Sequence, residues 1–151
     1  MKPHPAPATR LRSLHDQHGA PLVDFDWYPT LDLLYVYWHG HLTAASVVQG
    51  VQSALELPQF ATRPLPRRAL TNHQQVSGTW TEALPWLQYD WLPQAHARGL
   101  RLLAHVASQD PACRLSLQHE LPEFNDALRQ LLSGVRSFRH EPPAWYWLTH
   151  R

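Results

Sequence analysis

Residues 67–108 read RRALTNHQQVSGTWTEALPWLQYDWLPQAHARGLRLLAHVAS, and this stretch decides the fold. A short strand over Arg68–Asn72 leads into the turn Ser77-Gly78-Thr79, a tryptophan-rich helix and the apolar run Leu100–Ala107. Because that last run does not alternate with polar residues, it is typical of a strand covered on both faces. Strand, helix and strand in succession predict a parallel pair joined by a crossover helix. The Ser77 turn then falls at the carboxyl edge of the sheet, where sites on open α/β sheets usually lie.

The tryptophan-rich helix carries signals for its start, its middle and its end. Thr79 and Glu82 have the spacing of a capping box, while Pro85 favours either an irregular first turn or a helix capped by Thr81. Pro93 lacks the amide that would bond to residue 89, so we expect a kink near Trp91. Gly99 ends the helix at the position that glycine favours.

The remaining segments extend this alternation in both directions. We expect an edge strand at 11–15, an antiparallel hairpin of strands at 23–27 and 33–42, a helix from Thr43 to about Leu57, helices at 110–121 and from Pro122 to Gly134, a strand at 135–139 and a final helical turn after Pro142-Pro143. The order predicts an α/β fold with a mixed sheet: an N-terminal antiparallel hairpin, then alternating helices and strands, with the helices packed on the sheet.

Composition limits the class of protein. The 151 residues and 44% apolar content predict one domain over residues 11–151, preceded by a flexible arm at 1–10. A formal charge of +1 without a basic block argues against nucleic acid as a partner. No apolar run approaches the roughly 18 residues of a membrane span. One cysteine and an N-terminus without the apolar centre of a secretion signal favour a cytoplasmic protein.

Three phrases carry a resemblance to a known family: LLYVYWHGHLT at 33–43, VSGTWTEALPWLQYDWLP at 76–93 and GLRLLAHVAS at 99–108. With the order of elements, they resemble the STAS-like, SpoIIAA-like domains that occur singly in bacteria, over about residues 23–148. Uncharacterised members share a G-x-L-T strand end, here 40–43, a W-L-x-x-x-W-L-P helix, here 86–93, and a G-L-x-x-x-A-H-V strand, here 99–106. The resemblance implies a fold that serves partner switching, transporter tails and, in a related architecture, lipid carriage.

The resemblance also makes Ser77 a candidate phosphorylation site. Partner-switching relatives carry a phosphorylatable serine in a D-S-S-G-like turn before a helix, and here the matching residues are Val76-Ser77-Gly78, without the acidic residue. A phosphate is favoured at a helix N-terminus by free amides and the helix dipole. Ser77-Gly78 equally fits ordinary turn chemistry before a helix.

The histidines do not form a recognisable site. His39 and His41 flank Gly40 on one predicted strand, which puts both rings on one face, but zinc normally needs three or four ligands. His73 and His105 lie on or beside neighbouring strands and converge only if the strand register brings them together. We therefore expect structural histidines, no metal and no cofactor.

Other candidate catalytic residues have no activating partner. Cys113 lies in a predicted first helical turn, yet no histidine is placed to activate it. Asp24, Asp26 and Asp32 gather near the hairpin and fit solvated positions. We do not expect an enzyme. A deep cavity lined by His73, His105 and Ser77 would change that expectation.

Aromatic residues off the buried helix stripe direct the functional prediction. Trp86 and Tyr89 share a side away from Leu87, and Trp145 and Trp147 should not both point inward from one helical turn. We expect a non-catalytic regulatory or protein-interaction module that forms a homodimer, with a contact surface at Ser77, Gly78, Thr79, Trp86 and Tyr89. The alternative is a domain that binds a small apolar ligand or a lipid under its kinked helices, and an enzyme is a weaker third option.

Overall fold

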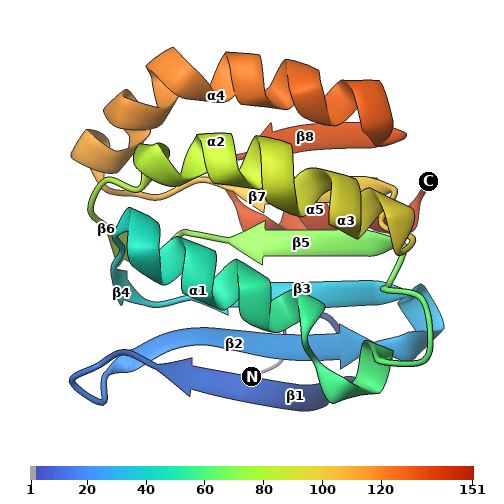
Figure 1. Cartoon of the computed structure of the whole chain (residues 1–151). Coiled ribbons are helices and arrows are strands. Elements are labelled where there is room, and N and C mark those ends of the chain that lie inside the picture. The colour runs from blue at the N-terminus through green and yellow to red at the C-terminus, as the bar shows by residue number, and fades with distance from the viewer. Residues whose placement is uncertain (1–2) are drawn as a thin grey trace.

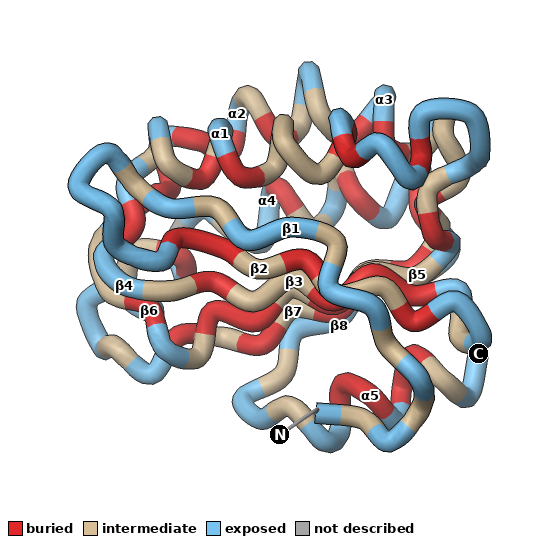
Figure 2. Tube along the Cα trace, turned by 90° about the horizontal axis from the view of Figure 1, so that it is seen from below, coloured by how far each residue is buried: buried red, intermediate tan, exposed pale blue. Residues whose placement is uncertain are grey.

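The computed structural model describes residues 3–151, without the side chain of His119, and shows three layers. A six-stranded sheet of order β1-β2-β3-β5-β7-β8 forms the middle layer. Helices α1 to α4 cover one face of the sheet and α5 covers the other (Figures 1 and 2). The strands of this sheet are β1 (Thr9–His15), β2 (Pro21–Tyr28), β3 (Leu33–Trp38), β5 (Arg68–Asn72), β7 (Leu102–Val106) and β8 (Gly134–Phe138).

The pairing of the strands confirms the predicted fold class. β1, β2 and β3 pair antiparallel, and β3, β5, β7 and β8 then pair parallel. β7 lies between β5 and β8, as its uninterrupted apolar sequence predicts. Each parallel pair is joined by helices on the same face, so the carboxyl ends of the parallel strands meet at one edge (Figure 1).

The N-terminal segment leads directly into the edge strand. β1 begins at Thr9, two residues before the predicted boundary of the domain. Ahead of it, Ala6 and Ala8 pack against the core under α5, and the ring of His4 lies 4.9 Å from that of Trp145. Residues 1 and 2 of the predicted arm lie outside the described residues, and flexibility of the arm stays a prediction.

The predicted strand at 33–42 is divided in two. β3 ends at Trp38, and Gly40 takes a left-handed backbone with φ of 74°. The chain then forms β4 (Gly40–His41), which pairs parallel with β6 (Val76–Ser77) in a separate small sheet. Sequence patterning missed the division because both pieces are rich in strand-forming residues.

α1 (Ala44–Leu55) begins where the sequence predicts. The Thr43 hydroxyl accepts a hydrogen bond from the amide of Ser46, and the Ser46 side chain bonds back to the Thr43 amide, so a capping box closes the first turn. Gly50 faces Trp38 so closely that an added Cβ would lie 2.4 Å from the indole. A short 3-10 turn, η2 (Pro58–Phe60), follows α1 and leads toward β5.

The predicted kinked helix is a succession of short segments. A 3-10 turn η3 (Thr81–Ala83) leads into α2 (Leu84–Trp86), a π-helical segment η4 (Leu87–Trp91) and α3 (Leu92–Ala97). The π turn ends two residues before Pro93, whose missing amide the wider turn accommodates. The irregular first turn is confirmed, since the 3-10 turn η3 begins at Thr81. The predicted caps are wrong, both the capping box of Thr79 and Glu82 and the cap at Thr81, because no side chain among the described residues caps η3 or α2.

α4 (Pro111–Leu131) is one helix that continues through Pro122, so the predicted break there is wrong. Its start is as predicted: the Asp110 carboxylate accepts a hydrogen bond from the Ala112 amide at 3.3 Å. The buried residues Leu117, Phe124 and Leu128 keep helical spacing across Pro122. Burial of this shared apolar face outweighs the one hydrogen bond that the proline removes.

α5 (Glu141–Thr149) buries both of its tryptophans, which contradicts the sequence prediction. Trp145 stacks on Tyr35 with ring centroids 5.5 Å apart. Trp147 lies over β8, where an added Cβ on Gly134 would come within 3.2 Å of the indole. Because Gly134 has no side chain, the Trp147 ring packs against the backbone of β8. Helical spacing alone would place Trp147 away from the face that buries Trp145.

Candidate functional site

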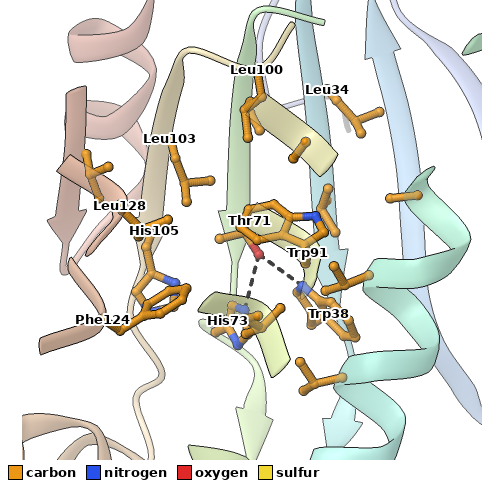
Figure 3. A pocket seen from close by; sticks show the side chains of 18 of the residues that line it. Leu34, Trp38, Thr71, His73, Trp91, Leu100, Leu103, His105, Phe124 and Leu128 are labelled. Carbon is orange, nitrogen blue, oxygen red and sulfur yellow. Dashed lines mark hydrogen bonds between the residues drawn. The ribbon is translucent and has the colours of Figure 1, made fainter. Parts of the chain in front are cut away.

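A cavity of about 140 Å³ lies between the sheet and the helices α1, η4, α3 and α4. It is lined by side chains from five strands and from all of these helices, and Figure 3 shows many of them pointing toward one another. Five large aromatic residues contribute to the wall: Phe25, Trp38, Trp80, Trp91 and Phe124. The face of the sheet under α5 is closed instead by tight aromatic packing.

The strand register arranges the sheet side of the cavity in two rows. Residues Leu34, Ala69, Leu103 and Val135 are paired across β3, β5, β7 and β8. Two positions further along each strand, a second row consists of Val36, Thr71, His105 and Ser137. All eight residues line the cavity. The first row is wholly apolar and the second is largely polar, so polarity increases toward the carboxyl ends of the parallel strands.

The polar row is linked to His73 through Thr71. The Thr71 hydroxyl accepts a hydrogen bond from Nε1 of Trp38 at 3.0 Å and lies 3.1 Å from Nε2 of His73 (Figure 3). Since the indole is only a donor, the hydroxyl proton is free to point at His73. In that arrangement His73 accepts at Nε2 and carries its own proton on Nδ1, for which the described residues provide no hydrogen-bond partner.

The two imidazoles of His73 and His105 lie side by side, with ring centroids 4.8 Å apart. Nε2 of His105 also has no partner. Burial, and then the neighbouring His105, hold the pKa of His73 well below its ordinary value. Burial lowers the pKa of His105 to about 4. Both rings are therefore neutral near pH 7, and each offers one donor and one acceptor.

The site residues that the sequence predicts do not line this cavity. The Ser77 hydroxyl lies 3.1 Å from Nδ1 of His41, at the small β4–β6 sheet. Gly78 follows with φ of 92°, and a Cβ there would meet the Leu42 carbonyl at 2.4 Å. Thr79 is exposed. These three residues lie beyond the carboxyl end of β5, as expected, but the predicted turn is wrong, because Ser77 belongs to β6 and only Gly78 bends the chain. Phosphorylation of Ser77 stays a prediction.

The two aromatic residues of the predicted contact surface differ in exposure. Trp86 is half-buried and packs against the larger core, whereas Tyr89 is 72% exposed on η4. The expectation that both are partly exposed therefore agrees with the structure. Nothing covers Tyr89 within the described residues.

The other sequence candidates have separate local roles. His39 and His41 do not share a partner, because Nε2 of His39 lies 2.7 Å from the Asp24 carboxylate and His41 meets Ser77. Among the described residues, no three His, Cys, Asp or Glu side chains gather as a metal ion would require. Cys113 is buried, and burial raises the pKa of its thiol, which favours a packing role.

The comparisons with known proteins concern the fold. No protein-family model and no curated protein sequence matches the chain. Among solved structures, the chain is similar to an uncharacterized protein of the DUF3478 family with a SpoIIAA-like fold, from Shewanella loihica PV-4. The identity is 16%, the match covers 98% of each chain and the TM-score is 0.45.

Between residues 3 and 151, the structure contains no helix with the length and apolar character needed to cross a bilayer. The sequence analysis includes an apolar ligand site under the kinked helices as an alternative, but it does not identify the residues that line the cavity. The sequence contains one indication of the polar part of the lining, because His73 and His105 are predicted to meet if the strand register brings them together. The register pairs Thr71 with His105, and His73 lies two residues after Thr71. Ser77, the third residue of that conditional cavity, is absent from the lining.

Proposed function

We propose that this domain binds a small, uncharged, mainly apolar molecule in the cavity between its sheet and its helices. The observation that carries the proposal is an apolar space of about 140 Å³ in an otherwise well-packed core. Protein interiors normally leave few voids larger than a water molecule. A cavity of about 150 Å³ lined by hydrocarbon stays dry and holds benzene.

The size of the cavity favours a compact ligand over a lipid. Sites for drug-sized molecules measure roughly 300–1,000 Å³, and the volume here is 140 Å³. A long acyl chain would need the helices to move apart. A single ring or a short branched chain matches a space of this size.

The lining gives no support to chemistry on the ligand. Among the described residues that form the wall there is no Asp, Glu, Lys, Arg or Cys. His73 and His105 are neutral, and no nucleophile is within hydrogen-bond distance of either ring apart from the Thr71 hydroxyl, which already binds Trp38. We propose binding without catalysis.

Toluene tests this proposal directly. Trp38, Trp80 and Trp91 line the cavity, so we expect saturable quenching or a shift of tryptophan emission, together with a rise in melting temperature. Ala69→Leu places extra carbons in the cavity from the centre of the sheet and should abolish binding. Ala97→Leu makes the same change on an exposed helix position and should leave it intact. Equal toluene binding by wild type and Ala69→Leu would refute the cavity as the site.

A protein-interaction role is the second candidate, and the exposed Tyr89 supports it. Aromatic residues are enriched in the cores of protein interfaces. If the chain forms the predicted homodimer through this surface, Tyr89→Ser should shift sedimentation toward the monomer. The matched change Tyr146→Ser, on the exposed side of α5, should not. A monomer at all concentrations would remove this candidate.

A further inference from the structure

We infer that the occupant of the cavity carries one uncharged hydroxyl group on a compact ring, a phenol-like molecule, and that this hydroxyl binds beside His105 in the polar row. The inference rests on the proposed function, since it names the chemical class of the ligand at that same site. It is carried by the uneven distribution of polar atoms around the cavity.

Polar side chains gather on one side of the space only. Thr71, His105 and Ser137 lie in register on three adjacent strands, and the row next to them is entirely apolar. Ser137 is exposed and Asn125 of α4 is half-buried, and both line the cavity. Its polar side therefore lies toward the edge strand β8. A ligand that fits this arrangement has an apolar body and one polar end.

The polar side lacks hydrogen-bond partners. Nδ1 of His73 and Nε2 of His105 are buried without a partner, although buried polar atoms of native proteins nearly always have one. His73 is only 4% exposed and is already hydrogen-bonded to Thr71. Its role is therefore to position the Thr71 side chain rather than to contact the ligand. His105 retains accessible surface and lines the cavity, which makes it the side chain that meets the ligand.

The chemistry of this row selects an uncharged hydroxyl. No charged side chain lines the cavity among the described residues, so a carboxylate or an ammonium group would be buried without a counter-charge. A neutral imidazole presents a proton at one ring nitrogen and a lone pair at the other, depending on its tautomer. A hydroxyl both donates and accepts, and therefore satisfies either form, whereas a carbonyl satisfies only one.

Phenol and toluene form a matched pair of probes, because they differ by a hydroxyl in place of a methyl group. Calorimetry on the full chain should give phenol a Kd equal to or below that of toluene, and benzoate should not bind. In an apolar cavity without partners, phenol would bind more weakly, since its hydroxyl loses water and gains nothing. His105→Leu should weaken phenol binding by about tenfold or more and change toluene binding by less than about threefold. His18→Leu, at an exposed turn, should change neither.

The outcomes separate the two proposals. If toluene does not bind, the proposed function fails and the inference fails with it. If toluene binds and phenol is at least tenfold weaker, or if His105→Leu leaves the ratio of the two constants unchanged, only the inference is overturned. Should His105→Leu not fold, Ser137→Ala supplies the second test: on this exposed edge position it should weaken phenol selectively, and equal losses for both probes would count against the polar row.

Discussion

Mild acid should destabilise this protein through His73 and His105. Burial lowers the pKa of His105 from its ordinary 6.5 to about 4, and the pKa of His73 moves in the same direction. Between about pH 4 and pH 6.5, His105 is protonated in the unfolded chain but stays neutral in the folded protein. The stabilisation that neutral histidine provides is therefore complete above about pH 6.5 and is lost as the pH falls toward 4.

The size of the effect follows from the pKa of His105. His105 is half-buried and lines the cavity, so its ring is only partly in contact with water. For a group that titrates near 6.5 when unfolded and near 4 when folded, going from pH 7 to pH 5 lowers the free energy of unfolding by about 2 kcal/mol. His73 adds to this loss. Carboxylates such as Asp16, whose pKa is lowered by hydrogen bonds from the Ala20 and His18 amides, contribute in a more acidic range.

Urea unfolding at pH 7, 6 and 5 measures the effect. The wild type should lose at least about 2 kcal/mol over this range with an unchanged m-value. His105→Leu should be less sensitive to pH by about 2 kcal/mol, and His18→Leu, which changes an exposed histidine, should follow the wild type. Parallel curves for wild type and His105→Leu would refute the assignment of the acid response to the buried pair.

Three further substitutions test the packing around the site. Thr43→Ala should cost about 1 kcal/mol in urea unfolding, because it removes the cap of α1, whereas Thr79→Ala should be close to neutral; the reverse order would mean that the sequence-predicted cap is the real one. Gly50→Ala should lower the melting temperature despite alanine's higher helix propensity, since the new Cβ meets Trp38 and overpacking costs about 1–3 kcal/mol; a stabilised variant would show that the indole moves freely. Glu141→Ala should cost about 1–3 kcal/mol, because the carboxylate accepts hydrogen bonds from Asn72 and Trp145, and no loss would mean that both donors find water instead.

Features that depend on neighbours along the chain were predictable. The caps at Thr43 and Asp110, an irregularity of the helix before Pro93 and the exposure of Tyr89 follow from short-range patterns. The structure contains the two caps and the exposed Tyr89, and the irregularity is the π-helical segment η4. Two of the errors share one cause. Trp147 is buried and α4 runs through Pro122 because partners distant in sequence outweigh the local preference.

The amino-acid sequence by itself therefore determined the order of strands and helices, because alternation and helical spacing are written in residues close together in the chain. Tertiary structure alone decided the cavity. Its existence depends on the strand register that sets Thr71 beside His105 and on the small gap that the helices leave above Ala69. Both depend on how segments that are far apart in the sequence pack against each other. A space of 140 Å³ is too small to be predicted from the volumes of the residues that surround it.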